Sequence, residues 1–129
     1  MPKSVTFWLL IAAILAVCYA IWPNYGGPGA VEAPETAAMA DIKGGLKSAI
    51  DQFKEGTGRY PNSLQDLFQQ PADVHKWIGP YVEPPQLPID PWGDPYLYQF
   101  PGRHNTNSYD LWSAGPDGKS DTEDDISNW

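Results

Sequence analysis

The strongest constraint on this chain is an uncharged, apolar run near its N-terminus. Residues 5–22 (VTFWLLIAAILAVCYAIW) contain no charged side chain, and Thr6 is the one strongly polar residue among them. Such a run approaches the roughly 20 residues that a helix needs to cross the apolar core of a bilayer. Every face of this helix would be apolar, which is unlike a helix buried in a small soluble domain. The run therefore predicts a single-pass transmembrane helix, with residues 1–22 as the anchor.

Positive charge around the run predicts its orientation. Lys3 precedes it, and no lysine or arginine follows until Lys43. By the positive-inside rule, the N-terminus is cytoplasmic and the rest of the chain lies outside the cytoplasmic membrane. Two alternatives are a cleaved signal peptide with Cys18 and Ala20 at its processing site, and a lipoprotein signal ending at Cys18. The run is longer than the apolar region of about 7–15 residues that is usual for a signal peptide.

Composition divides the remaining chain into a linker and one small domain. Residues 23–29 hold two prolines and three glycines, which break or loosen a helix, so we expect a linker over 23–34. Residues 35–129 are enough for one globular domain with its own core and too few for two large ones.

Charge and motifs exclude several functions. The formal net charge of −8 argues against nucleic acid, which proteins bind through clusters of lysine and arginine. The two histidines, His75 and His104, stand apart in polar sequence, and no hydrolase or metalloprotease motif is present. We therefore expect no enzyme activity and no small-molecule substrate.

The spacing of apolar residues predicts one long helix in the domain. Between residues 35 and 53, apolar side chains recur every three or four positions and define one face. Gly44 and Gly45 interrupt this helix, and each costs about 1 kcal/mol relative to alanine. Either another segment packs closely against them, or the helix is marginal. Gly56 and Gly58 are expected to end it.

Shorter elements are expected after the long helix. Asn62 or Ser63 is expected to cap one short helix, and a second is expected over Ala72–Ile78. Five prolines over 79–91 exclude a helix there. Two aromatic-rich runs, 96–100 and 109–113, predict an antiparallel hairpin, which needs a helix across one face for stability. The predicted fold class is therefore α+β, with an amphipathic helix packed on a small antiparallel β-meander.

The residues best suited to chemistry lie in an acidic segment near the C-terminus. Residues 117–125 contain five carboxylates and one lysine. Like charges repel, so a compact loop here favours a bound cation. Oxygen donors without histidine or cysteine favour Ca²⁺. An EF-hand is excluded by spacing, because Thr122 stands where that motif needs glycine and Asn128 where it needs a bidentate glutamate. A solvated acidic turn that binds no ion is the alternative.

Three stretches together resemble the globular domain of the type II secretion major pseudopilin. They are 59–61 (RYP), 87–96 (LPIDPWGDPY) and 109–129 (YDLWSAGPDGKSDTEDDISNW), and the resemblance spans roughly residues 41–129. It implies a structural Ca²⁺ in a C-terminal calcium loop and gives Asp90 and Asp94 the roles of turn and capping residues. The implied ligands are the side chains of Asp117, Asp124 and Asp125 and the backbone carbonyls of Ala114 and Lys119.

The N-terminus is atypical for this family. Pseudopilins carry a glycine before the cleavage point of their leader and a glutamate five residues into the mature chain. Here no glycine precedes Phe7, and Ile11 stands where the glutamate would fall if Phe7 were first.

The residues and the resemblance together predict a non-enzymatic structural subunit or accessory of a type II secretion pseudopilus-like assembly. Its Ca²⁺-stabilised domain would be periplasmic, and its partners would be the membrane and other pseudopilin or secretion-system subunits. One alternative is a membrane-anchored extracytoplasmic binding module that uses exposed aromatic residues such as Trp77, Tyr81 or Trp129. Another is a metal-dependent hydrolase built on the acidic loop.

Overall fold

A computed structural model describes residues 33–129 of the chain. The predicted anchor (1–22) and nearly all of the predicted linker (23–34) lie outside the described residues. Within residues 33–129, no helix is both long and apolar enough to cross a membrane. The described unit, Ala33–Trp129, begins close to the expected start of the globular domain.

The predicted long helix is confirmed, in three consecutive parts. They are α2 (Pro34–Ala40), a π-helical segment η1 (Asp41–Gly45) and α3 (Leu46–Thr57). Gly58 ends the helix in the left-handed conformation, with a φ of 83°, and its N–H donates to the carbonyl of Lys54. The buried residues of the helix are Ala38, Ile42, Leu46, Ala49, Ile50 and Phe53. This is the apolar face that the spacing predicts.

The two glycines of η1 do not serve close packing. A β carbon added at Gly44 would meet no atom within 4 Å, and one at Gly45 would meet Asp41 Oδ1 at 3.9 Å. Glycine lowers helix propensity by about 1 kcal/mol relative to alanine, and two in succession weaken the α-helical backbone. Of the two explanations that the sequence leaves open, the structure therefore favours a locally weak helix.

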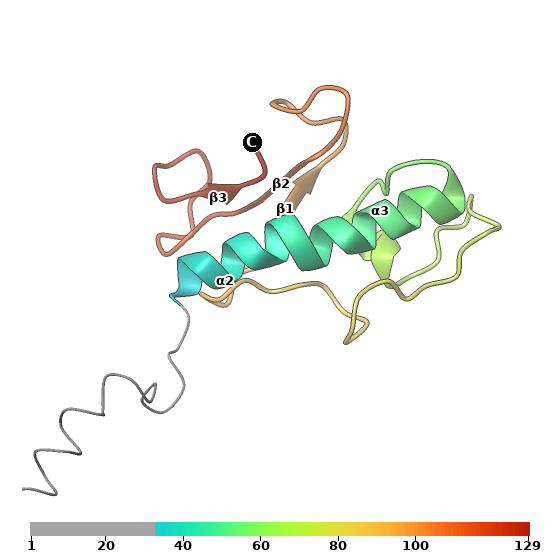
Figure 1. The fold of residues 1–129 in the computed structure, drawn as a ribbon, viewed down its shortest axis with the longest axis horizontal. Helices are drawn as coiled ribbons and strands as arrows, with labels where there is room; N and C mark the ends of the chain where they lie inside the picture. Colours follow the sequence, from blue (N-terminus) through green and yellow to red (C-terminus); the bar gives the residue numbers. More distant parts are fainter. Residues whose placement is uncertain (1–32) are drawn as a thin grey trace, which may run out of the picture. The chain divides into compact units, whose positions relative to one another are not determined.

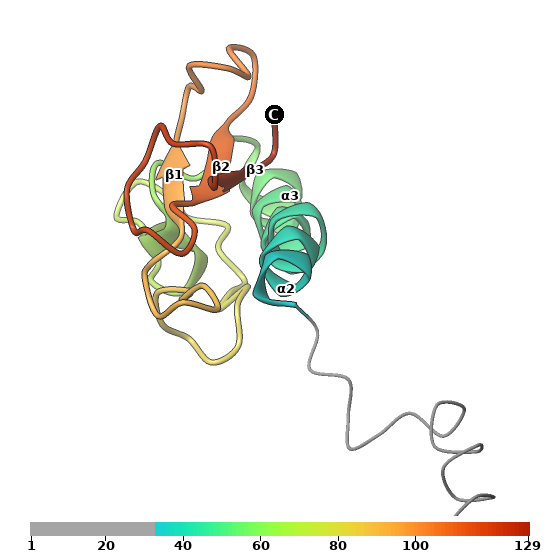
Figure 2. The same ribbon diagram turned by 90° about the vertical axis from the view of Figure 1, so that its left-hand side faces the viewer.

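A three-stranded antiparallel sheet forms the second layer. Its strands β1 (Leu97–Gln99), β2 (Asp110–Ser113) and β3 (Ile126–Ser127) lie in the order β1-β2-β3. The predicted hairpin is confirmed as β1 and β2, with Tyr98 opposite Leu111. Figures 1 and 2 show the sheet and its loops on one side of the helix, so the fold is α+β as predicted.

Strand β3 is not among the predicted elements, because two residues carry no periodic signal. The side chain of Asn128 extends its pairing with β2. Its Oδ1 accepts the N–H of Leu111 at 3.0 Å, and its Nδ2 donates to the carbonyl of Tyr109 at 3.1 Å. The side-chain amide of Asn128 thus makes two hydrogen bonds to the backbone beside β2 that the backbone of a longer strand would otherwise make.

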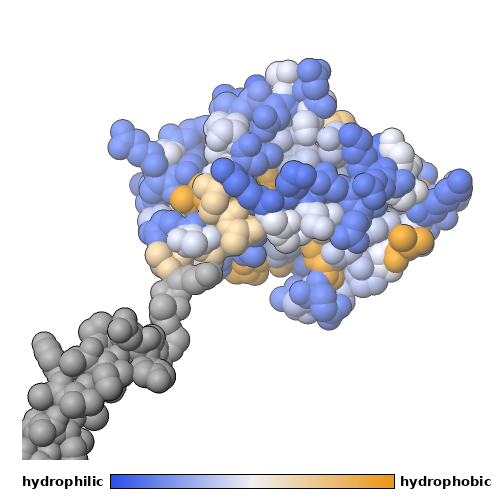
Figure 3. Space-filling model, in the orientation of Figure 1, coloured by the Kyte–Doolittle hydropathy of each residue, from blue (hydrophilic) through white to orange (hydrophobic). Residues whose placement is uncertain are grey.

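Aromatic side chains complete the core between the helix and the irregular segments. Tyr96 and Tyr109 are buried, while Trp77 and Tyr81 are partly buried and pack against the core. Trp77 also donates its Nε1–H to the carbonyl of Asp66 at 3.0 Å. Trp77 and Tyr81 are therefore not free for an exposed binding patch, whereas Trp129, the third residue suggested for it, is 46% exposed. Figure 3 shows a mostly hydrophilic face, with apolar residues gathered beside the start of α2.

Two local predictions need correction. Residues 72–78 form turns and bends, not a helix, because Trp77 is held by Asp66 and the exposed Asp73 pairs with Arg59. A seven-residue helix without caps is marginal in any case. Ser63 does take the N-cap position of the 3₁₀ helix η2 (Leu64–Leu67), but its side chain makes no capping hydrogen bond. Instead, Asp66 accepts the N–H of Asn62.

Candidate functional site

The acidic segment forms the loop between β2 and β3, and a buried polar contact fixes its start. Ser113 ends β2 and is fully buried, and its hydroxyl donates to Asp90 Oδ2 at 2.5 Å. The N–H of Gly115 donates to the same hydroxyl oxygen at 3.1 Å. Asp90 Oδ1 accepts the N–H groups of Trp92 and Asp94. Asp90 therefore stabilises a turn, as expected, and also anchors the acidic loop.

Left-handed backbone conformations fold the loop back on itself. Gly115 and Gly118 have φ values of 65° and 66°, and Asp121 has a φ of 66°. A β carbon at Gly115 would lie 2.3 Å from the carbonyl oxygen of Asp124 and 3.1 Å from its Oδ2. Since no side chain fits there, glycine lets the two ends of the loop touch.

The predicted side-chain ligands accept backbone hydrogen bonds within the loop. Asp124 Oδ2 accepts the N–H of Asp117 at 3.1 Å, and Asp125 Oδ2 accepts the N–H of Asp121 at 2.8 Å. Asp117 Oδ1 accepts the N–H of Lys119 at 2.8 Å. One oxygen of each carboxylate is thereby held in place, and Asp124 and Asp125 each keep a second oxygen, Oδ1, for another partner.

These two oxygens, together with Asp117 Oδ1 and the carbonyl oxygen of Lys119, surround the hydroxyl of Thr122. Its Oγ1 lies 2.5 Å from Asp124 Oδ1, 3.3 Å from Asp125 Oδ1, 3.5 Å from Asp117 Oδ1 and 2.9 Å from the carbonyl oxygen of Lys119. The Thr122 hydroxyl is the leading influence that lowers the pKa of Asp124, with a further contribution from the N–H of Asp117. Four of the five predicted ligand groups therefore meet at one point.

The oxygens around Thr122 Oγ1 outnumber the hydrogen-bond donors available to them there. A hydroxyl has one proton and satisfies one of the four surrounding oxygens as a donor. The candidate ligand atoms are all oxygens, which suits a hard cation such as Ca²⁺. Within residues 33–129, no three Asp, Glu, His or Cys side chains lie close enough together to hold a metal ion, and the Thr122 hydroxyl occupies the point between the three carboxylates. An ion here would therefore need backbone or hydroxyl oxygens as well as carboxylates.

The fifth predicted ligand group stands slightly apart. Ala114 is buried at the base of the loop, directly before Gly115, and no hydrogen bond in the described part of the chain joins it to the Thr122 cluster. Asp94 lies near the loop from outside, since its Oδ2 would be 3.3 Å from a β carbon at Gly118. Sequence reasoning missed Thr122, because threonine in an acidic loop carries no distinctive pattern.

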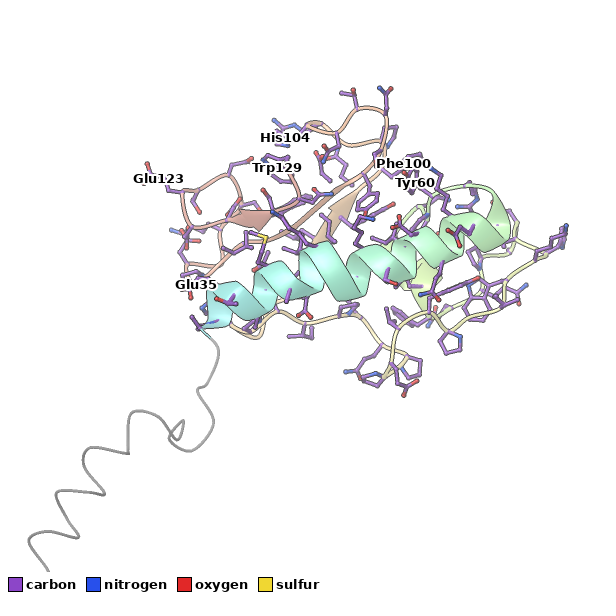
Figure 4. The ribbon with its side chains drawn as sticks, in the orientation of Figure 1. Glu35, Tyr60, Phe100, His104, Glu123 and Trp129 are labelled. Atoms are coloured by element: carbon purple, nitrogen blue, oxygen red, sulfur yellow. The ribbon has the colours of Figure 1, made fainter. Side chains whose placement is uncertain are left out.

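Aromatic rings connect the acidic loop with the tip of the β1–β2 hairpin. Trp112 donates its Nε1–H to Ser120 Oγ at 3.0 Å and contacts the ring of Trp129 edge to face. Trp129 stacks on His104, with ring centroids 4.0 Å apart (Figure 4). The expectation that His104 stands alone is therefore wrong.

A buried carboxylate organises the hairpin tip. Asp110 is 2% exposed and accepts the N–H groups of Arg103, His104 and Asn105 at 2.7–2.9 Å. Burial, the largest single influence, raises the pKa of Asp110, but these hydrogen bonds and one from the His104 ring together hold it below the usual value. The Asp110 carboxylate therefore stays ionised inside the protein.

The fold matches a solved pseudopilin. It superposes on the crystal structure of the major pseudopilin from the type 2 secretion system of enterohaemorrhagic Escherichia coli with a TM-score of 0.64. The two share 32% sequence identity, and the match covers 80% of this chain and 92% of that chain. Together, the helix, the small sheet and the C-terminal loop define a pseudopilin globular domain.

Sequence comparison identifies the family. Residues 29–129 match the family described as Type II secretion system (T2SS), protein G. The type II secretion system core protein G of Escherichia coli K12 is 36% identical over 130 residues, covering 94% of this chain and 84% of that protein. The one from Pseudomonas aeruginosa is 33% identical over 138 residues, covering 95% and 93%. The chain belongs to the type II secretion system protein G family, which confirms the resemblance seen in the sequence.

Proposed function

We propose that this pseudopilin is stabilised by one Ca²⁺ in the loop between Gly115 and Asp125. The observation that carries the proposal is the convergence of three carboxylates and the Lys119 carbonyl on Thr122 Oγ1. Asp117, Asp124 and Asp125 would hold the ion through side chains, with the carbonyls of Ala114 and Lys119 completing the set. Ca²⁺ suits this loop better than Mg²⁺, because it accepts six to eight oxygens in flexible geometry.

The role of the ion would be structural. Bound Ca²⁺ would offset two of the three negative charges that otherwise repel, and it would bind the folded loop but not the unfolded chain. Such binding stabilises the folded state by about 2.7 kcal/mol when the free ion is at 100 times its dissociation constant. The loop would then hold β3 firmly against β2, since it joins these two strands.

The chain would act as an anchored subunit of a pseudopilus-like assembly. The apolar run at 5–22 supports a single-pass anchor in the cytoplasmic membrane, with the globular domain in the periplasm. Its partners would be other pseudopilin or secretion-system subunits, in a role without catalysis. The alternative of a separate binding module has less support, because Trp77 and Tyr81 pack on the core.

Direct titration with a luminescent ion tests the site. Tb³⁺ binds oxygen sites of the Ca²⁺ type and emits when a nearby tryptophan is excited, and Trp112 contacts the loop through Ser120. We expect full-length chain in detergent to bind one Tb³⁺ that Ca²⁺ displaces. Asp117→Asn, Asp124→Asn and Asp125→Asn should each weaken binding at least about tenfold, or 1.4 kcal/mol.

Glu123→Gln is the matched control. Glu123 is an exposed carboxylate of the same loop, outside the predicted ligand set. Its substitution should change affinity little, by a factor of about 2–3 from the loss of one nearby charge. Equal loss in all four variants would mean that the loop attracts ions only through its net charge.

A further inference from the structure

A groove lies between the helix and the hairpin tip, apart from the acidic loop. It has a volume of about 460 Å³ and lies between η1 and α3 on one side and the segment 105–109 with Asn128 on the other. Ile42 and Tyr109, both buried, contribute to its floor. Its rim is polar and includes two exposed lysines, Lys43 and Lys47.

Two lysines and one aspartate line this groove, Lys43, Lys47 and Asp51, so its charged side chains sum to +1 in an otherwise acidic chain. Lys43, Lys47 and Lys54 come from one helix, whereas the whole chain has 8 lysines and arginines and a net charge of −8. Lys47 pairs with Asp51 at 2.5 Å, and the Lys54 ammonium lies 4.1 Å from the centre of the Tyr60 ring. Among the described residues, Lys43 forms no ion pair. The groove therefore suits an acidic segment.

The acidic loop offers two carboxylates that the ion would not use. Asp121 and Glu123 are exposed and lie outside the predicted ligand set. With five carboxylates and one lysine, residues 117–125 carry a charge of −4, so one Ca²⁺ would leave −2. Figure 4 shows Glu123 at the outer edge of the loop, directed away from the domain. The charge that remains is thus presented outward.

Within one chain, the carboxylates of the acidic loop form no ion pair with Lys43 or Lys47. None of the ion pairs in residues 33–129 joins the acidic loop to the helix. We propose that the acidic loop of one copy docks through Asp121 and Glu123 on the groove of a second copy, at Lys43 and Lys47. The two surfaces differ, so the contact is head-to-tail and extends an open row of subunits. It rests on the proposed function in two respects, that copies assemble and that the ion occupies Asp117, Asp124 and Asp125 and leaves Asp121 and Glu123 available.

Cross-linking between isotopically distinct copies tests the contact. Full-length chain in detergent, half of it labelled with ¹⁵N, would be treated with a carbodiimide that joins amines to carboxylates in direct contact. We expect linked peptides that connect Lys43 or Lys47 to Asp121 or Glu123 and contain one labelled and one unlabelled partner. Their absence, or pairs drawn from a single copy only, would overturn the proposal.

Charge reversal supplies an independent test by sedimentation. Lys43→Glu and Glu123→Lys should each weaken self-association about tenfold, and the double variant should recover most of the loss because the charges are exchanged. Lys76→Glu reverses an exposed charge away from the groove and should have little effect. Weakening by both single variants without recovery in the double variant would contradict a direct contact.

The same variants separate this contact from the ion site. Lys43 and Glu123 are not ligands, so both single variants should keep the thermal shift produced by Ca²⁺. A retained shift with unchanged self-association would overturn the docking contact and leave the ion site intact. Loss of the shift in the ligand variants is a separate outcome and bears on the ion alone.

Discussion

Asp110 shows how much one side chain determines in this domain. A carboxylate that is 2% exposed is costly unless it is well hydrogen-bonded, and three backbone N–H groups and the His104 ring meet this need. The backbone of the hairpin tip is thereby held in place by the ionised carboxylate of Asp110. His104 in turn stacks on Trp129, next to the ring that contacts the acidic loop.

Asp110→Asn should therefore destabilise the domain. The amide has one acceptor oxygen in place of two and turns a donor toward backbone N–H groups, so we expect a loss of about 2–3 kcal/mol at pH 7 in urea unfolding. The native pKa of Asp110 is below its unfolded value of about 3.9. Its contribution is therefore present above that value and lost as the pH falls through the native pKa.

The difference in free energy of unfolding between the native chain and Asp110→Asn should therefore become smaller as the pH falls toward 3. Asp73→Asn is the control, because Asp73 is an exposed partner of Arg59 and such pairs contribute less than about 1 kcal/mol. A difference that is constant between pH 7 and pH 3 would contradict the assigned role of the Asp110 charge.

For individual residues, the sequence predicts which residue types form a site better than it predicts which atoms they contact. The acidic composition of 117–125 and the resemblance predict Asp117, Asp124 and Asp125 as ligands, and this stays a prediction. Neither could indicate Thr122, because its role depends on where four oxygens meet in space. The aromatic run at 109–113 places Asp110 in a strand and no more, since its hydrogen bonds come from a turn whose conformation the sequence does not specify.

At the scale of elements, the long helix carries an internal weakness. Its apolar face is continuous from Ala38 to Phe53, yet the backbone widens into a π turn at Asp41–Gly45. Tyr96 holds this turn from the sheet side by donating its hydroxyl to Asp41 Oδ2 at 2.8 Å. Burial is the leading reason that the pKa of Tyr96 is raised, so the hydroxyl keeps its proton.

Replacing the glycines of this turn should strengthen the helix. Gly44→Ala and Gly45→Ala have room for the added carbon and should each raise the free energy of unfolding by up to about 1 kcal/mol. For a domain of this size, that corresponds to a rise in melting temperature of roughly 4–8 °C.

Gly102→Ala is the contrasting variant, because it should lower the free energy of unfolding. Its added carbon would lie 2.5 Å from Asp110 Oδ1 and 2.8 Å from the carbonyl oxygen of Asn105, so this variant should melt lower than the native chain. If Gly44→Ala and Gly45→Ala also melted lower, the glycines would be required by the native backbone, and the helix would not be merely weak there.

Elements with strong periodicity are predictable, and short ones are not. The helix and the β1–β2 hairpin follow from apolar spacing and aromatic runs. Strand β3 and the irregular segment 72–78 depend on contacts between distant residues, such as Asn128 with Leu111 and Trp77 with Asp66. Local sequence does not contain these contacts, so it predicts a helix in one place and misses a strand in another.

At the scale of the whole described domain, residues 33–129, lysines and the densest group of carboxylates lie on different segments. One helix edge carries lysines, and the loop between β2 and β3 carries five carboxylates. The proposed Ca²⁺ site and the proposed contact between copies both use the acidic loop. Ca²⁺ would offset two of the three negative charges of the inner carboxylates and order the loop, and the outer carboxylates would remain available to a second copy.

A thermal melt of the full-length chain in detergent tests the central claim most directly. It would be recorded in EGTA, in millimolar Ca²⁺ and in equal Mg²⁺, for the native chain, Asp125→Asn and Glu123→Gln. We predict a rise of several degrees with Ca²⁺, little change with Mg²⁺, loss of the rise in Asp125→Asn and its retention in Glu123→Gln. Equal melting of the native chain in EGTA and in Ca²⁺ would contradict the proposal that this loop is a structural calcium site.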